Sequence, residues 1–170
     1  MRYTTSFLLL FTLLFTRPVA ANLFDIIGDE KGVNPAVLWL IALQESAPPG
    51  SYAPHPWTAN WAGKGYYYPT RLEAYRAISE AVDEGYKVDV GLMQVNWFYH
   101  EHRFNHDLWA ALDPEVNIRV AADILLGFSR HGVYEAIGRY HCPNWQLDWC
   151  RKRAERYSQN VIARLQHYEN

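Results

Sequence analysis

A glutamate that follows a long apolar segment is the side chain in this sequence best suited to acid–base chemistry. Residues 35–43 are almost all apolar, and Glu45 continues the helical face of Ile41 and Ala42 at spacings of four and three. Burial and the negative end of the helix dipole both disfavour a carboxylate, so we expect Glu45 to keep its proton near neutral pH, as a general acid must. The alternative is a structural role, the commoner reason for a glutamate at a helix end.

The second candidate segment, residues 89–96, combines a glycine with polar side chains and reads Asp-Val-Gly-Leu-Met-Gln-Val-Asn. Gly91 allows a backbone to approach a ligand closely, and Gln94 and Asn96 offer donors and acceptors to sugar hydroxyl and acetamido groups. Met93 offers adaptable apolar contact. The segment therefore suits the floor of a sugar-binding cleft, although an ordinary turn around a buried methionine has the same composition.

Taken together, the Glu45-Ser46 pair and the Gly-Leu-Met-Gln stretch resemble the signature of the lytic transglycosylases that have the soluble-transglycosylase, lysozyme-like fold. The resemblance covers roughly residues 23–157. It implies a mainly α-helical, goose-lysozyme-type domain with a short β-hairpin excursion, in which the glutamate ends a core helix and the glycine stretch crosses the floor of the cleft. It assigns catalysis to Glu45. The substrate-binding residues that it implies are Ser46, Gly91, Leu92, Met93, Gln94, Asn96 and Tyr140.

Two further parts of the family pattern have counterparts in this sequence. Residues 121–125, with small and apolar side chains, match a helix packed behind the catalytic one. The family normally has a Tyr-Asn pair whose tyrosine hydroxyl hydrogen-bonds the catalytic carboxyl, and the match here is Tyr140 followed by His141. His141 departs from the pattern, and it serves either to bind substrate or to pack locally.

The number of well-placed carboxyl groups bears on the reaction. A typical glycosidase uses two carboxylates, whereas Glu45 is the one strong candidate here; Asp89 is either a second carboxylate or a residue that orients the turn. Acting alone, Glu45 would protonate the oxygen between N-acetylmuramic acid and N-acetylglucosamine, then accept a proton from the muramoyl 6-hydroxyl. The resemblance thus implies a 1,6-anhydromuramoyl product and no cofactor. The alternatives are a goose-type lysozyme hydrolase and a peptidoglycan-binding assembly factor without turnover.

Other kinds of chemistry find little support in the sequence. His100, Glu101, His102 and His106 do not have the His-Glu-x-x-His spacing of a helical zinc site, so we expect no metal. A Gly-x-Ser-x-Gly nucleophile elbow is absent. Aromatic side chains crowd the segment between the two motifs, where they either stack on sugars or form a lid on the core.

The start of the chain predicts export. Arg2 precedes an apolar run, residues 7–15, and a Val-x-Ala pattern at residues 19–21, which together indicate a signal peptide cleaved before Asn22. The alternative is a retained membrane anchor, which the short run disfavours. Residues 22–170 then form one transglycosylase domain, in the periplasm. Small exported transglycosylases of this kind open the wall for secretion, conjugation or pilus machines, so the resemblance implies a membrane-complex partner besides peptidoglycan.

The charge of the mature chain bears on its partners, and its cysteines bear on its cross-links. Without residues 1–21 the chain keeps 14 of its 16 basic residues against 18 acidic ones, a formal net charge of −4 that disfavours nucleic acid as a partner. In an oxidising compartment Cys142 and Cys150 are expected to pair, and the disulfide would hold a loop beside the active site. The alternative is two free thiols.

The elements that must position these residues are mostly helices. Capping pairs at Asn34-Pro35 and Asp113-Pro114 begin two of them. Gly132 ends the second of these, and Gly32 and Gly85 end two other helices. A Gly-Lys-Gly turn at residues 63–65 predicts a hairpin within residues 47–69, the only β-structure that we expect. The predicted helices span residues 22–31, 35–46, 71–84, 114–130, 134–140 and 149–168.

Overall fold

The computed structural model describes residues 19–168 of the 170-residue chain, and the side chains of residues 23–165. Most of the predicted signal peptide, residues 1–18, lies outside the described residues. The described part consists mainly of α-helices, with one small four-stranded antiparallel sheet. The prediction of a mainly α-helical fold is therefore confirmed, and the predicted bounds of the domain stay a prediction.

The helix that carries Glu45, α2 (Pro35–Ser46), runs through the core. Its start is fixed as predicted, because the Asn34 side chain accepts a hydrogen bond from the Ala36 amide at 2.8 Å and Pro35 occupies the first turn. Helices α1 (Val19–Lys31) and α8 (Asp148–Tyr168) pack against it. The apolar residues buried along α2 are Val37, Leu38, Leu40, Ile41 and Ala42. Burial of so many apolar side chains is the main stabilisation of this helix.

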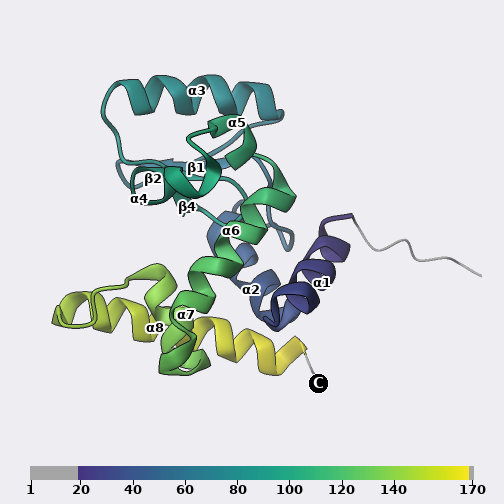
Figure 1. The fold of residues 1–170 in the computed structure, drawn as a ribbon, viewed down its shortest axis with the longest axis vertical. Coiled ribbons are helices and arrows are strands. Elements are labelled where there is room, and N and C mark those ends of the chain that lie inside the picture. Colours follow the sequence, from purple (N-terminus) through teal and green to yellow (C-terminus); the bar gives the residue numbers. More distant parts are fainter. Residues whose placement is uncertain (1–18, 169–170) are drawn as a thin grey trace, which may run out of the picture.

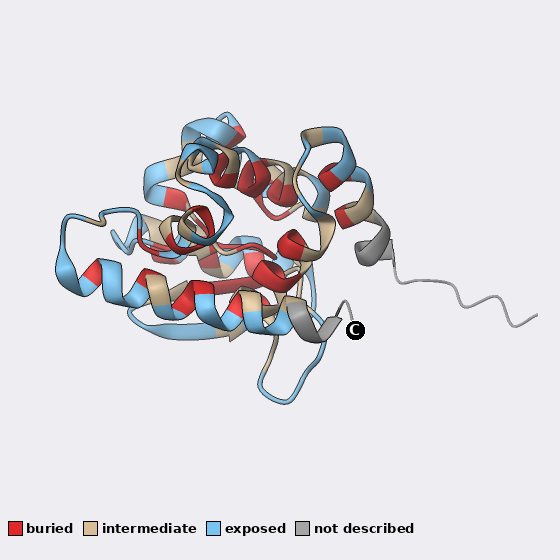
Figure 2. Ribbon diagram, turned by 90° about the horizontal axis from the view of Figure 1, so that it is seen from below, coloured by how far each residue is buried: buried red, intermediate tan, exposed pale blue. Residues whose placement is uncertain are grey.

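Three helices complete the half of the molecule that holds α2. Helix α6 (Pro114–Gly127) is capped by the Asp113 carboxylate, which accepts from two amides of the first turn. Helix α7 (Val133–His141) packs along α8, and Figure 1 shows both below α6. Helix α8 turns an intermittent apolar face inward, and Figure 2 shows buried positions recurring along it. This periodicity follows from the helical repeat of 3.6 residues.

The sheet forms the other half, together with α3 (Arg71–Asp83) and α5 (Leu108–Ala111), which lie above it in Figure 1. Its strand order is β2-β1-β3-β4, all antiparallel. The four strands are β1 (Thr58–Trp61), β2 (Lys64–Tyr67), β3 (Asp89–Val90) and β4 (Val95–Asn96). The predicted hairpin is present as β1 and β2. The expectation of no other β-structure is wrong, since β3 and β4 are also present. The sequence does not reveal them because strands of two residues are too short to show an alternating pattern.

Short helical elements between β4 and α6 also went unpredicted. They are α4 (Trp97–His100), a 3₁₀ turn (Glu101–Phe104) and α5 (Leu108–Ala111). Four-residue helices show less than two turns of periodicity, so packing and not pattern determines them. The helix predicted to reach residue 130 ends at Gly127 and continues as a 3₁₀ turn (Ser129–His131).

Helix α6 connects the two halves. It begins beside α5 in the sheet half and ends beside α7 in the helical half, as Figure 1 shows. A cleft lies where the halves meet. None of the helices within residues 19–168 has both the length and the apolar character needed to cross a bilayer.

Candidate active site

A cleft of about 570 Å³ opens between the sheet and the helices α6, α7 and α8. Side chains from both halves of the molecule line it, from Asn60 in β1 to Arg153 in α8. Of the site residues predicted from the sequence, the cleft is lined by Glu45, Gln94, Asn96 and Tyr140. Asp89 and His141, whose roles the sequence left open, line it as well. The residues singled out from the sequence thus bring two carboxyl groups, two amides, a phenol and an imidazole to the cleft.

Four other predicted site residues lie beneath the cleft and not on its surface. Ser46, Leu92 and Met93 are at most 1% exposed, and Gly91 is buried. The Ser46 hydroxyl donates to the Ala42 carbonyl at 2.9 Å, within its own helix. These residues therefore support the walls and floor of the cleft, because no side-chain atom of theirs lines it.

The Glu45 carboxyl has the property expected of a general acid. Its pKa is raised from an ordinary value of 4.5 to about 7. Burial is the main cause and the negative charge of Asp89 adds to it, whereas the nearby Tyr157 hydroxyl partly offsets the rise. Glu45 is the penultimate residue of α2, so the negative end of that helix dipole also disfavours its ionised form. At neutral pH about half of the molecules therefore hold the proton.

Tyr157, which sequence analysis did not assign to the site, faces Glu45 from α8. Its hydroxyl is buried and makes no hydrogen bond of standard geometry with any described residue, yet it lies close enough to lower the carboxyl's pKa. Burial and the Glu45 charge raise the pKa of this phenol well above its ordinary value. A signal for it existed, because Tyr157 stands one turn from Ala154 and Val161 on the buried face of an otherwise polar helix.

Tyr140 lies in the cleft, but its hydroxyl donates to the Met93 carbonyl at 2.7 Å, whereas the family resemblance implied a bond to Glu45. It therefore ties α7 to the floor of the cleft. The adjacent His141 ring stacks on Tyr157, with centroids 4.6 Å apart and planes nearly parallel. Burial and the nearby Arg153 guanidinium lower the pKa of His141. His141 thus packs against Tyr157 while also lining the cleft, so the two roles left open are compatible.

The floor of the cleft is a turn held from below by Asn117 of α6. The Asn117 amide donates to the carbonyls of Val90 and Ala111 at 3.1 and 2.9 Å, and its oxygen accepts from the Met93 amide at 2.7 Å. A Cβ on Gly91 would lie 2.7 Å from the Asn117 nitrogen, and Gly91 has a φ of +79°. Glycine is therefore required at 91 for close packing against Asn117, and not for the close approach of a ligand.

Thr58 joins the end of α2 to this floor. Its hydroxyl lies 2.9 Å from the His55 carbonyl and 3.5 Å from that of Ser46. Its own carbonyl accepts from the Gly91 amide at 2.8 Å and from the Gln94 side chain at 3.1 Å. One buried residue in β1 therefore couples the helix end that carries Glu45 to the turn below the cleft.

Asp89 and Asn96 face each other across the β3–β4 pair. The Asn96 amide donates to the Asp89 carboxylate at 2.7 Å, and the Asn96 oxygen is buried with no described partner. Burial raises the pKa of Asp89, and the Asn96 hydrogen bond partly offsets that shift. Asp89 is therefore a second carboxyl group in the cleft, bonded to a side chain in place of the expected turn backbone.

Cys142 and Cys150 form the disulfide expected from the sequence, with Cα atoms 5.5 Å apart. The loop that it closes borders the cleft at Pro143. Arg139 also holds the loop, because its guanidinium donates to the Pro143 carbonyl at 3.0 Å and lies over the Trp145 ring. The position of the C-terminal edge of the cleft thus depends on this short cross-linked loop.

The aromatic side chains of residues 52–68 mostly pack against the protein itself. Trp61 stacks on Tyr66 with centroids 3.8 Å apart, and Trp57, Trp61 and Tyr68 pack against the core. Tyr52 is 93% exposed. From β1 and the hairpin turn, only Asn60 and Gly63 line the cleft within the described part of the chain. These observations favour a lid on the core over a row of sugar-stacking surfaces.

The histidine-rich segment does not assemble into a metal site. His100 lines the cleft, and His106 pairs with Glu101 at 3.5 Å. Across the residues that the structure describes, no three His, Cys, Asp or Glu side chains come together in the way that a metal ion requires.

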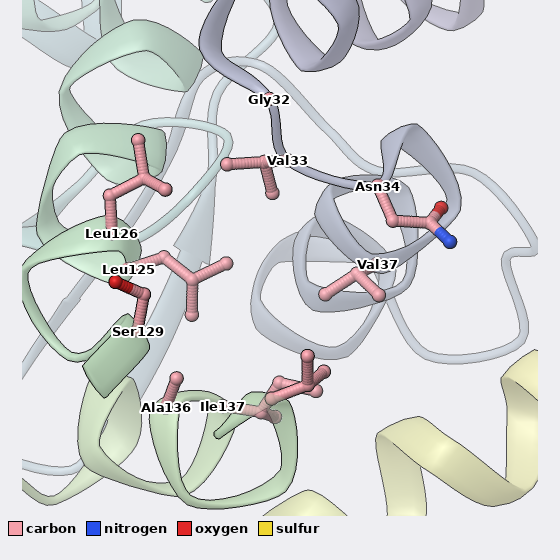
Figure 3. A pocket seen from close by; sticks show the side chains of 10 residues that line it. Gly32, Val33, Asn34, Val37, Leu125, Leu126, Ser129, Ala136 and Ile137 are labelled. Atoms are coloured by element: carbon pink, nitrogen blue, oxygen red, sulfur yellow. The ribbon is translucent and has the colours of Figure 1, made fainter. Parts of the chain in front are cut away.

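A separate cavity of about 140 Å³ lies where α2, α6 and α7 meet (Figure 3). Its lining is largely aliphatic, from Val33, Val37, Leu125 and Ile137, with polar side chains only at Asn34 and Ser129. It contains no titratable side chain, so it offers no acid–base chemistry. The cleft at Glu45, which brings two carboxyl groups together, is the candidate active site.

Searches with this chain against known protein families, against curated proteins and against solved structures gave no match.

Proposed function

We propose that this protein is a peptidoglycan lytic transglycosylase, with Glu45 as its acid and base. The observation that carries the proposal is the Glu45 carboxyl itself, which lines an open cleft and has a pKa of about 7 because of burial. A carboxyl with this pKa can donate a proton and accept one at neutral pH, since both of its forms are populated there. The proposal includes membership of the lysozyme-like family and a location in the periplasm.

The reaction needs one proton donor and no external nucleophile. Protonated Glu45 donates to the glycosidic oxygen as the bond between C1 of N-acetylmuramic acid and that oxygen breaks. The muramoyl 6-hydroxyl then bonds to C1, and its proton passes to the Glu45 carboxylate. The carboxyl returns to its starting form, and the products are a 1,6-anhydromuramoyl end and a free 4-hydroxyl on N-acetylglucosamine.

The floor of the cleft offers groups that suit an N-acetylated sugar. The Asn96 oxygen is buried without a described partner, so it can accept a hydrogen bond from an acetamido N–H. The nitrogen of the Gln94 side chain is already bonded to the carbonyls of Thr58 and Gly91, which leaves its oxygen to accept from a sugar. Two acceptors at the floor therefore supply orientation, and their ties to the protein keep them fixed.

A goose-type lysozyme hydrolase is the second candidate, and Asp89 is the observation that favours it. Asp89 lines the same cleft as Glu45 and is near enough for its charge to raise the pKa of Glu45. A second carboxylate can act as general base toward a water molecule. In the lyase, by contrast, Asp89 has no proton to move and serves to keep Glu45 protonated.

The deciding experiment digests purified sacculi with the wild-type protein and with Glu45→Gln, and identifies the soluble products by mass spectrometry. We expect anhydromuramoyl ends from the wild type, lighter than reducing ends by one water, and no products from the variant. Reducing ends alone would replace the lyase with the hydrolase. Full activity of Glu45→Gln would remove Glu45 from the mechanism, and inactivity of both proteins would favour a peptidoglycan-binding assembly factor for a secretion, conjugation or pilus machine.

A further inference from the structure

A second cavity, of about 260 Å³, adjoins the cleft at Glu45. Glu45, His141 and Arg153 border both cavities, so the two form one groove that passes the carboxyl. The cleft side of this groove is lined in large part by the sheet half. The second side is lined by α2, α7 and α8 alone. A chain of sugars that crosses Glu45 must therefore contact α8 on this second side.

One face of α8 forms much of the second cavity. Its lining residues there are Arg153, Arg156, Tyr157 and Asn160, at spacings of three and four that place them on the same side of a helix. Tyr157 is buried against Glu45, whereas both arginines are exposed. The arginines therefore present their guanidinium groups to the groove beside the residue that faces the catalytic carboxyl.

These two arginines differ from the other basic residues on α8. Arg151 and Lys152 each form an ion pair with Asp148 at 2.7 Å. Arg153 and Arg156 make no ion pair with any carboxylate among the side chains of residues 23–165. The second cavity has Glu45 as its one acidic lining residue. Two positive charges thus line a cavity whose one carboxyl group, that of Glu45, forms an ion pair with neither of them.

We propose that Arg153 and Arg156 bind a carboxylate on the lactyl arm of the N-acetylmuramic acid residue. This arm is what distinguishes muramic acid from N-acetylglucosamine; it ends in a free carboxylate in peptide-free strands and carries the acidic stem peptide in others. The planar guanidinium group binds carboxylates through two parallel hydrogen bonds. The arginines would thereby select which of the two alternating sugars lies against Glu45. This inference rests on the proposed function.

The test measures binding with Glu45→Gln protein, so that no ligand is consumed. The ligands are three tetrasaccharides: one of alternating N-acetylglucosamine and N-acetylmuramic acid with stem peptides, the same sugar with free lactyl groups, and chitotetraose, which has no carboxylate. The arginines are replaced in Arg153→Gln/Arg156→Gln. The matched control is Arg151→Gln/Lys152→Gln, which removes the same charge from the same helix outside both cavities.

We expect Arg153→Gln/Arg156→Gln to bind the two carboxylate-bearing ligands about tenfold or more weakly than its parent protein does, since hydrogen bonds to charged groups contribute that much. It should bind chitotetraose as tightly as the parent. The control pair should bind all three like its parent. A loss confined to the peptide-bearing sugar assigns the site to the carboxylates of the stem peptide, and a loss confined to the free-lactyl sugar assigns it to the lactyl carboxylate. A loss with both means that the arginines accept either carboxylate. If both double variants lose affinity equally, or neither loses any, the inference is overturned. The proposed function is unaffected as long as the wild type digests sacculi. If the wild type digests nothing and no ligand binds, the proposed function fails as well.

Discussion

At the scale of single residues, the site depends on the balance of influences on one carboxyl. Burial raises the pKa of Glu45, the Asp89 charge raises it further, and the Tyr157 hydroxyl lowers it. The result is near 7 because the neighbours partly oppose each other. This balance can be tested one neighbour at a time, both through stability and through the pH dependence of activity.

Replacing Glu45 with glutamine should stabilise the protein at alkaline pH. The folded state keeps the Glu45 proton up to a pKa of about 7, whereas the unfolded chain loses it near 4.5. Wild-type stability therefore falls as pH rises from 4.5 to 7, by on the order of 3 kcal/mol relative to the variant. Urea unfolding of both proteins at pH 4 and pH 8 measures this difference. A gap that is the same at both pH values would contradict a raised Glu45 pKa.

The variant Asp89→Asn should move the alkaline limb of the activity profile to lower pH. It removes the negative charge that raises the pKa of Glu45, while the Asn96 amide can still donate to the new side-chain oxygen. In the lyase, turnover below pH 6 should therefore survive. Rates of sacculus digestion between pH 4 and pH 9 provide the measurement. Complete inactivity at every pH would instead assign Asp89 as the base of a hydrolase.

Tyr157→Phe should shift the Glu45 pKa in the direction opposite to that of Asp89→Asn. Its hydroxyl favours the ionised form of Glu45, so its removal should raise the pKa of the carboxyl and extend activity to higher pH. The phenyl ring keeps the stacking contact with His141. Shifts of Asp89→Asn and Tyr157→Phe in the same direction would show that the two neighbours do not act through the charge of Glu45.

At the scale of elements, α6 fixes the floor of the cleft through Asn117. The side chain of this fully buried residue bonds three backbone groups, two of them in the segment from β3 into the turn. The Met93 carbonyl of the same turn accepts from Tyr140 of α7. The floor is thus held by the start of α6, the helix that connects the two halves, and by α7 from the helical half.

Asn117→Ala should destabilise the protein by about 3 kcal/mol, because it removes three buried hydrogen bonds, one from the Met93 amide and two to the carbonyls of Val90 and Ala111. Gly91→Ala should cost about 2 kcal/mol or more, through its positive φ and its clash with Asn117. The two variants should not add, since the clash disappears once Asn117 is shortened. Denaturant unfolding of the singles and the double measures the coupling; strict additivity would mean that the two residues do not meet.

The elements also differ in how far the sequence predicts them. The bounds of α2 and the starts of α3 and α6 follow from capping residues and apolar periodicity, which are local properties. Strands β3 and β4 and helices α4 and α5 are too short for periodicity and depend on long-range packing. The same difference holds for the site: a glutamate after an apolar run is visible in the sequence, whereas the roles of Tyr157 and Asn117 require knowledge of which helices meet.

At the scale of the whole molecule, the cleft depends on how the C-terminal helices are held. Helices α7 and α8 contribute Tyr140, His141 and Arg153 to it, and the disulfide closes the loop between them. These contributions come from residues about a hundred positions after Glu45. The cross-link therefore matters for the site even though neither cysteine lines it.

Removal of the disulfide in Cys142→Ala/Cys150→Ala should lower the free energy of unfolding by about 2 to 3 kcal/mol, the usual contribution of a short cross-linked loop. The Arg139 bond to the Pro143 carbonyl should retain the loop in part. Thermal unfolding, with and without reductant, gives the comparison: the wild type should lose stability on reduction, and the variant should not respond. Equal stability of oxidised wild type and variant would show that the loop is fixed without the bond.

The hydrogen bonds of Thr58 determine which part of the hairpin is free to vary. They are all at the base of β1, and they connect the end of α2 to the floor of the cleft. The tip, with Ala62 and Gly63, lies at the far end of the strand and has a positive φ at both residues. Insertions at this tip leave the base untouched and change only the edge of the cleft that Gly63 lines, so the tip is where a designer can graft loops that alter which ligands the cleft admits.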